Sequence, residues 1–217
     1  MGKKAVLLAL LSVMLGVSSA AAQNYGITFR AGTTGPGVAL TRSFGKHFSL
    51  SLGGNYFPYT LNGSTTTNEV NVAYQANLTM ESFSALIDWQ PFRNWLRVSA
   101  GVYYNNLKVT GSANPTNSYS IEGHTFSPQK LGSLSGSVDF AHKLAPYIGL
   151  GIGNAANNGH HIGFLIDGGV MYTNAASVAM SGSGLIGATA DQASNIQDGL
   201  SGIKIYPVVT FGLSYRL

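Results

Sequence analysis

The feature that most constrains the fold of this chain is an alternation of apolar and polar side chains that continues to its last residue. In the C-terminal segment TFGLSYRL, the odd-numbered residues are large and apolar and the even-numbered residues are small or polar. Successive side chains of a β-strand point to opposite faces, so the segment predicts a strand with one apolar face. The same alternation occurs in the segments 48–59, 95–106, 144–153 and 162–172.

The composition excludes an ordinary soluble surface for these strands. Of the 217 residues, 45% are hydrophobic and only 9% are charged, whereas about 25% are charged in an average soluble domain. No run beyond the N-terminal segment approaches the 18 or more apolar residues that a membrane helix needs. A transmembrane β-barrel, whose backbone groups all pair between strands, is then the favoured fold class.

The N-terminus predicts export. Lys3 and Lys4 precede an apolar stretch, 5–17, and the small residues 20–22 form a cleavage site before Gln23. This is the pattern of a secretory signal peptide at 1–22, which leaves a mature domain at 23–217. There is no cysteine, hence no disulfide framework. Cleavage leaves ten basic against eight acidic residues, which gives no basis for nucleic-acid binding.

Two kinds of barrel remain, and they differ in which face is apolar. A lipocalin-like soluble barrel would carry its apolar residues inside. Here aromatic residues lie beside the tight turns and the C-terminus, and others lie eight to ten residues further along their strands, as expected for aromatic girdles at the two membrane interfaces. The first group is Phe44, Phe48, Trp89, Phe92, Trp95 and Tyr215, and the second is Tyr56, Tyr104 and Tyr172. The apolar face is therefore expected to contact lipid.

The connections support an up-and-down antiparallel barrel of eight strands. Short turns such as SFGKHF and QPFRNW alternate with long segments rich in Ser, Thr, Asn and Gly, as in barrels with short periplasmic turns and long extracellular loops. The apolar phase flips around GTTGPG, which is either a turn or a glycine kink, and the even strand count favours the turn. A second flip near Glu81–Phe83 predicts a β-bulge. A short helix is expected near Thr189–Leu200.

The segment APYIGLGIGN resembles the PYxGLGxG strand of small proteobacterial outer-membrane barrels similar to OmpA and OmpW. The final alternating strand also resembles the signal that the barrel-assembly machinery reads, although it ends in Leu217, with Tyr215 two residues earlier, rather than in Phe. The resemblance implies an outer-membrane location in a Gram-negative bacterium, surrounded by outer-membrane lipid and lipopolysaccharide. It implies no particular activity.

The inward-facing parity carries most of the charge. Asp88 and Arg97 flank the QPFRN turn and are expected to form a cross-strand ion pair, with Arg30 and Asp167 at comparable heights. Glu81, Lys204 and Tyr206 are expected higher in the lumen. An eight-stranded barrel is just wide enough for side chains to fill it, so this network is predicted to close the lumen.

Other functions have little support in the sequence. No GxSxG, HExxH or GxGxxG motif occurs in a suitable setting, and no histidine is expected opposite an inward serine. The adjacent His160 and His161 fall in a turn and would point in opposite directions. We therefore expect no enzymatic activity, metal or cofactor. The favoured role is structural or interactive; the alternatives are a narrow OmpW-like pore or transporter for small or hydrophobic molecules and, third, a lipid-modifying enzyme.

Overall fold

The structure is a computed structural model, which describes residues 25–67, 70–92, 95–121, 124–140, 142–153, 161–202 and 204–217. The predicted signal peptide, 1–22, lies outside the described residues, as does His160.

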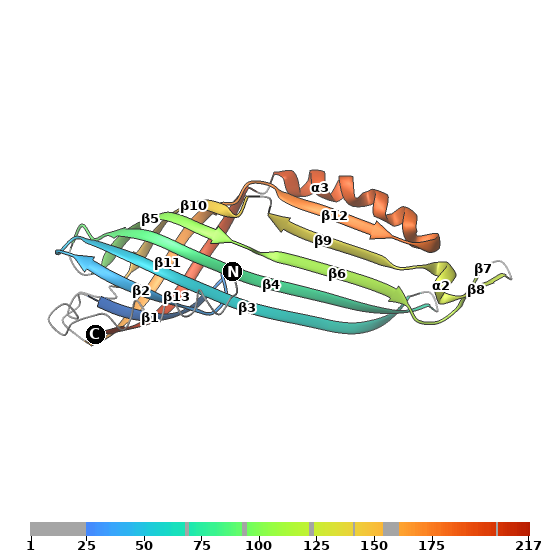
Figure 1. Ribbon diagram of the computed structural model, residues 1–217, viewed down its shortest axis with the longest axis horizontal. Coiled ribbons are helices and arrows are strands. Elements are labelled where there is room, and N and C mark those ends of the chain that lie inside the picture. Colours follow the sequence, from blue (N-terminus) through green and yellow to red (C-terminus); the bar gives the residue numbers. More distant parts are fainter. Residues whose placement is uncertain are drawn as a thin grey trace, which may run out of the picture.

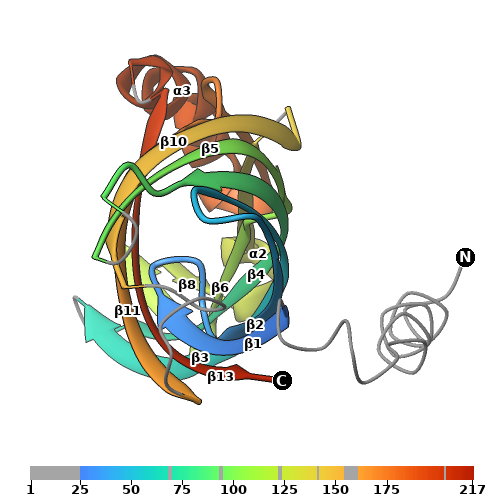
Figure 2. The ribbon, with the colours of Figure 1, turned by 90° about the vertical axis from the view of Figure 1, so that its left-hand side faces the viewer.

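Eight antiparallel strands close into a barrel, which confirms the predicted fold class (Figures 1 and 2). In order around the barrel they are β1 (Tyr25–Gly32), β2 (Gly37–Phe44), β3 (Phe48–Thr67), β4 (Val70–Trp89), β5 (Leu96–Asn105), β10 (Leu144–Ile152), β11 (Ile162–Tyr172) and β13 (Ile205–Arg216). The pairing of β1 with β13 closes the ring. Each strand is neighbour to the next barrel strand along the chain, so the topology is up and down.

The GTTGPG segment is a turn, as the even strand count required. Gly32 ends β1 and Gly37 begins β2, and the Gly35 amide donates to the Gly32 carbonyl at 2.9 Å. Gly35 has φ +86°, a left-handed conformation that glycine adopts without steric cost. The two ends of the described chain therefore lie at the same end of the barrel, where Gly26 pairs with Arg216.

The barrel wall continues beyond its other end on one side as an open sheet, here called the extension (Figure 1). Its strands are the outer halves of β3 and β4, which have 20 residues each, followed by β6 (Lys108–Pro115), β9 (Leu134–Phe140) and β12 (Ala176–Gly182). Much of the sequence expected to form loops is therefore strand. Threonine, which is abundant there, fits a pleated surface and tolerates water on its polar side.

The β-bulge predicted near Glu81–Phe83 is absent. The β3–β4 register runs unbroken from Phe48 opposite Trp89 to Thr67 opposite Val70. The apolar parity of β4 nevertheless changes from even to odd there, at the level where β4 exchanges neighbours. Below it β4 pairs with β5 inside the barrel, and above it with β6 in the extension.

Short elements complete the extension. They are α2 (Pro128–Leu131), the hairpin of β7 (Tyr119–Ile121) and β8 (His124–Phe126), the 3₁₀ helix η2 (Gly184–Gln192) and α3 (Ala193–Ser201). The helix expected near 189–200 is thus present, and α3 lies beside β12 in Figure 1. Within the described part of the chain, no helix has the length and apolar character needed to cross a membrane.

Candidate functional site

Four charged side chains from four strands meet inside the barrel, and we call them the charged layer. They are Arg30 on β1, Asp88 on β4, Arg97 on β5 and Asp167 on β11, and all four line one internal cavity. Each has the parity that faces inward on its strand, as the alternation predicts. Two positive and two negative groups balance the formal charge of the layer.

Arg97 is the centre of the charged layer. Its guanidinium forms an ion pair with Asp167 and a second, longer one with Asp88 at 3.9 Å between Nη1 and Oδ2. The Arg97 and Asp88 side chains are 8% and 2% exposed, so both charges are removed from water. A buried charge is tolerated only with such partners.

A glycine makes the contact between Arg97 and Asp167 possible. Gly151 on β10 lies opposite Arg97 on one side and opposite Asp167 on the other. A Cβ at position 151 would clash with the Asp167 carboxylate. The missing side chain thus leaves a gap through which Arg97 reaches across one strand to its partner.

Asp88 is held mainly by its direct neighbour. Ser99 is opposite Asp88 in the β4–β5 register, and its hydroxyl donates to Asp88 Oδ1 at 2.6 Å. Arg97 is the diagonal neighbour rather than the facing one. The predicted cross-strand pair of Asp88 and Arg97 is therefore present, but the shorter ion pair of Arg97 is with Asp167.

Arg30 is bound by neutral groups. Its Nε donates to Asn55 Oδ1 at 2.8 Å, and its Nη2 donates to the Ser84 hydroxyl at 3.0 Å. Gly53 gives it room, because a Cβ there would clash with the guanidinium. Arg30 thus shares the level of the acidic residues and is fixed by hydrogen bonds to β3 and β4.

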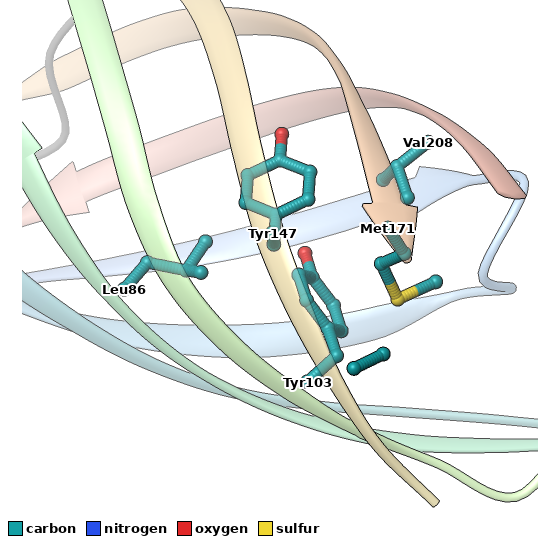
Figure 3. Packing of buried hydrophobic residues seen from close by; sticks show 6 residues of the cluster. Leu86, Tyr103, Tyr147, Met171 and Val208 are labelled. Atoms are coloured by element: carbon teal, nitrogen blue, oxygen red, sulfur yellow. The ribbon is translucent and has the colours of Figure 1, made fainter. Parts of the chain in front are cut away.

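An apolar cluster fills the barrel next to the charged layer (Figure 3). It consists of Leu86, Tyr103, Ala145, Tyr147, Met171 and Val208. The rings of Tyr103 and Tyr147 meet edge to face, with centroids 5.2 Å apart. Such aromatic pairs add roughly 0.5–1.5 kcal/mol beyond the area they bury.

Sequence reasoning missed this cluster because it assigned a polar character to the whole lumen. The signal was available: Leu86, Tyr103, Tyr147, Met171 and Val208 all have the inward parity of their strands. Large apolar residues at inward positions of a small barrel indicate a packed interior.

The space left inside is small. The cavity between the charged layer and the cluster has a volume of about 40 Å³. A water molecule needs at least ~10–15 Å³, so the cavity has room for a few waters.

The three remaining predicted lumen residues lie outside the charged layer. Glu81 has the outward parity of β4 and accepts a hydrogen bond from Asn106 Nδ2 at 3.2 Å, where β4 leaves the barrel. Lys204 is exposed just before β13. Tyr206 does face inward: it packs against the apolar cluster, and its hydroxyl donates to the Thr33 carbonyl at 2.6 Å.

The predicted aromatic girdle residues all lie on the outer surface. Phe44, Phe48 and Trp89 are successive cross-strand neighbours near the turn end, each about half exposed. The remaining turn-end members, Phe92, Trp95 and Tyr215, are 61%, 56% and 50% exposed, and Phe92 stacks on Trp95. Tyr56, Tyr104 and Tyr172 are exposed near the opposite rim.

Arg42 is a charged residue on the same outer face. Its guanidinium lies 5.3 Å from the ring centre of Tyr25 and 5.2 Å from that of Phe44. Both contacts are within the range of a cation–π interaction. The charge is therefore held among aromatic rings at the turn end.

The histidines form no metal site in the described residues, where no group of three or more potential ligands comes together. His161 stacks on Tyr215 and His47 contacts the Gln90 carbonyl at 3.0 Å. These are contacts at the turn end of the barrel, distant in register from the charged layer.

No family model and no curated relative matches the chain. Solved structures do match. The crystal structure of CarO2 from Acinetobacter baumannii superposes with a TM-score of 0.59 and 21% sequence identity, over 89% of this chain and 98% of CarO2. That of Acinetobacter baumannii CarO gives a TM-score of 0.57 and 21% identity, over 88% of this chain and 97% of CarO. This likeness shows a shared fold, whereas the resemblance to OmpA and OmpW stays a prediction.

Proposed function

We propose that this chain is an integral outer-membrane β-barrel protein with a closed interior, whose role is to hold the extension outside the membrane for interactions. One observation carries the proposal: the two faces of the wall exchange polarity at one level of the molecule. On β4 the apolar residues face outward from Phe83 to Trp89, and they take the opposite parity from Tyr74 to Met80.

Below that level the outer surface has the chemistry of a lipid-facing wall. Ile148, Phe164 and Phe211 are 59%, 78% and 58% exposed on it. Single exposed apolar residues are common, but a continuous apolar belt around a barrel indicates a surface that is covered by lipid. β5 and β11 have 10 and 11 residues, which is the length of about 9–11 residues that spans a membrane.

Above that level the outer surface has the chemistry of a water-facing sheet. Asn77, Thr110, Ser112, Ser135 and Ser137 lie on the face that continues the lipid-facing one. Hydroxyl and amide groups bind water readily and would be costly in hydrocarbon. The exchange of polarity is expected where the chain leaves the membrane.

The filled interior supports a role other than conduction. An ion would have to pass the Arg97–Asp167 pair and the Tyr103–Tyr147 contact. A buried ion pair and a close-packed aromatic pair both resist rearrangement. The proposal assigns no enzymatic activity and no cofactor to the chain.

The barrel-assembly machinery and the lipids of the outer membrane are the partners that this proposal implies. β13 is the C-terminal strand, and its apolar outward face from Ile205 to Tyr215 is the segment we propose the barrel-assembly machinery recognises. Outer-membrane lipid and lipopolysaccharide would surround the barrel, with Arg42 among the aromatic rings at one interface.

Planar-bilayer recording tests the proposal. Purified protein that migrates as a folded, heat-modifiable band on gels should insert into the bilayer without steady unitary currents. Reproducible unitary currents from folded monomer would refute the closed interior and favour a narrow pore. Recovery of the protein only in the soluble fraction, with no band that shifts on boiling, would refute the membrane location.

A further inference from the structure

The two edges of the extension differ in whether their outer backbone groups are occupied. At one edge, α3 lies against β12 (Figure 1). The Gln197 side chain of α3 forms hydrogen bonds with the backbone of that strand. Its Oε1 accepts from the Val178 amide at 2.7 Å, and its Nε2 donates to the Ala176 carbonyl at 2.6 Å. A side chain that occupies these groups prevents another strand from pairing there.

The opposite edge is the outer half of β3, residues 57–67. The pairing of β3 with β2 ends where Gly37 faces Asn55, and the last backbone contact on that side is from the Tyr56 amide to the Pro36 carbonyl at 3.0 Å. Among the described residues, no other strand pairs with β3 beyond this point except β4, on the opposite side.

The parity of the strand determines which backbone groups this edge presents. Because the Tyr56 amide points away from β4, the amides and carbonyls of the following even-numbered residues point the same way. Pro58 is the first of them and has no amide to offer, which is where proline is tolerated on an edge. Thr60, Asn62, Ser64 and Thr66 follow, each with one donor and one acceptor.

The side chains of this edge leave the backbone accessible and carry no charge. The Thr60 hydroxyl donates to Asn77 Oδ1 at 2.9 Å and that of Thr66 to Asn71 Oδ1 at 2.6 Å, so both are turned toward β4. The segment 57–67 contains no Asp, Glu, Lys or Arg, the residues that most often protect an edge. Tyr59 and Leu61, 51% and 46% exposed, lie on the apolar face.

We propose that the outer edge of β3 is a β-strand addition site for an extended segment of a partner polypeptide, in which apolar residues alternate with uncharged polar ones. Main-chain hydrogen bonds to the even-numbered residues would supply affinity, and the apolar side chains of the partner would extend the row formed by Tyr59 and Leu61. The inference rests on the proposed function, because it requires the extension to lie outside the membrane.

The direction of β3 argues against a second copy as the occupant. Two copies inserted in one membrane have their β3 strands running away from the same surface, whereas antiparallel pairing needs strands of opposite direction. A second copy could pair only in parallel, which is slightly less stable per residue, so the partner we propose is a different chain that approaches in the opposite direction.

A peptide with the sequence of residues 70–80, VNVAYQANLTM, is a suitable probe. It has the required alternation and no charge, and the same residues pair with residues 57–67 of β3 on its inner side. Binding of the fluorescently labelled peptide to the folded protein in detergent micelles is measured by fluorescence anisotropy.

Two substitutions at position 62 separate the role of the backbone amide from that of the side chain. Asn62→Pro removes an amide that points away from β4, as Pro58 already does, whereas Asn62→Ala keeps the amide and removes the side chain. The peptide should bind wild-type and Asn62→Ala protein alike and bind Asn62→Pro about tenfold more weakly, because one hydrogen bond is lost and the ring obstructs its neighbour.

Heat-modifiability on gels distinguishes failure of this inference from failure of the proposed function. If all three proteins fold as barrels and the peptide binds none of them, or binds Asn62→Pro as well as wild type, the edge is not a strand-addition site and the proposed function stands. If the folded protein self-associates and the peptide competes with this association, the occupant is a second copy and the inference is overturned. If no barrel forms, the proposed function itself fails.

Discussion

Replacing Arg97 with methionine should be the most destabilising single change in the charged layer. Methionine keeps the apolar stem of the side chain and removes the guanidinium, which leaves Asp88 and Asp167 without their shared cation. Removing one partner of a buried ion pair costs about 3–5 kcal/mol, because the remaining charge is uncompensated. Two carboxylates are affected here, so we expect a loss near the upper end of that range.

The isosteric change Asp88→Asn should cost much less. The carboxamide oxygen would still accept a hydrogen bond from the Ser99 hydroxyl, and Arg97 would keep its shorter ion pair with Asp167. What is lost is the difference between a charged and a neutral hydrogen bond together with a contact at 3.9 Å. This amounts to about 1 kcal/mol.

Urea unfolding of the refolded barrel in detergent micelles measures both changes, with the folded fraction read from gel mobility without boiling. The midpoint should fall further for Arg97→Met than for Asp88→Asn, with the slope unchanged. Equal losses for the two variants, or a larger loss for Asp88→Asn, would refute the assignment of Arg97 as the shared partner.

Two further predictions test the gap in the wall and the lipid-facing surface. Gly151→Ala should lower the free energy of unfolding by about 1–3 kcal/mol, because its Cβ would clash with Asp167. The control Gly168→Ala, whose Cβ would meet nothing within 4 Å, should be nearly neutral. Equal effects of the two substitutions would show that the gap at Gly151 is not required. Val209→Arg should reduce insertion into lipid vesicles, because a charge at the bilayer midplane costs about 2–4 kcal/mol. The control Ser177→Arg, on the extension, should insert normally. Unimpaired insertion of Val209→Arg would contradict the lipid-facing assignment.

Much of the fold could be predicted from the sequence because a barrel of antiparallel strands is encoded locally. Alternation in segments such as 162–172 determines the strand and its two faces without knowledge of its neighbours. The turn residues of GTTGPG, together with the even strand count, predicted the turn that joins β1 to β2. The inward positions of Asp88, Arg97, Arg30 and Asp167 followed from parity alone.

The contacts inside the barrel could not be predicted in the same way, because they depend on register. Whether Arg97 meets Asp88 or Asp167 is determined by which residues of β4, β5, β10 and β11 are neighbours, and by the absence of a side chain at Gly151. A change of one residue in register would move every side chain to the other face. The sequence provides parity within a strand but not the alignment between distant strands.

The sequence by itself determined that this chain forms strands with one apolar face, how many of them close the barrel, and that Arg30, Asp88, Arg97 and Asp167 lie inside, whereas Glu81 and Lys204, also predicted inside, do not. Only the tertiary structure decided what the second phase flip means. The flip at Glu81–Phe83 has the sequence signature of a β-bulge, but the backbone continues unbroken and the surroundings change instead. In the barrel the apolar side of β4 faces outward and in the extension it lies on the opposite face, so the strand reverses its pattern without any change in its own geometry.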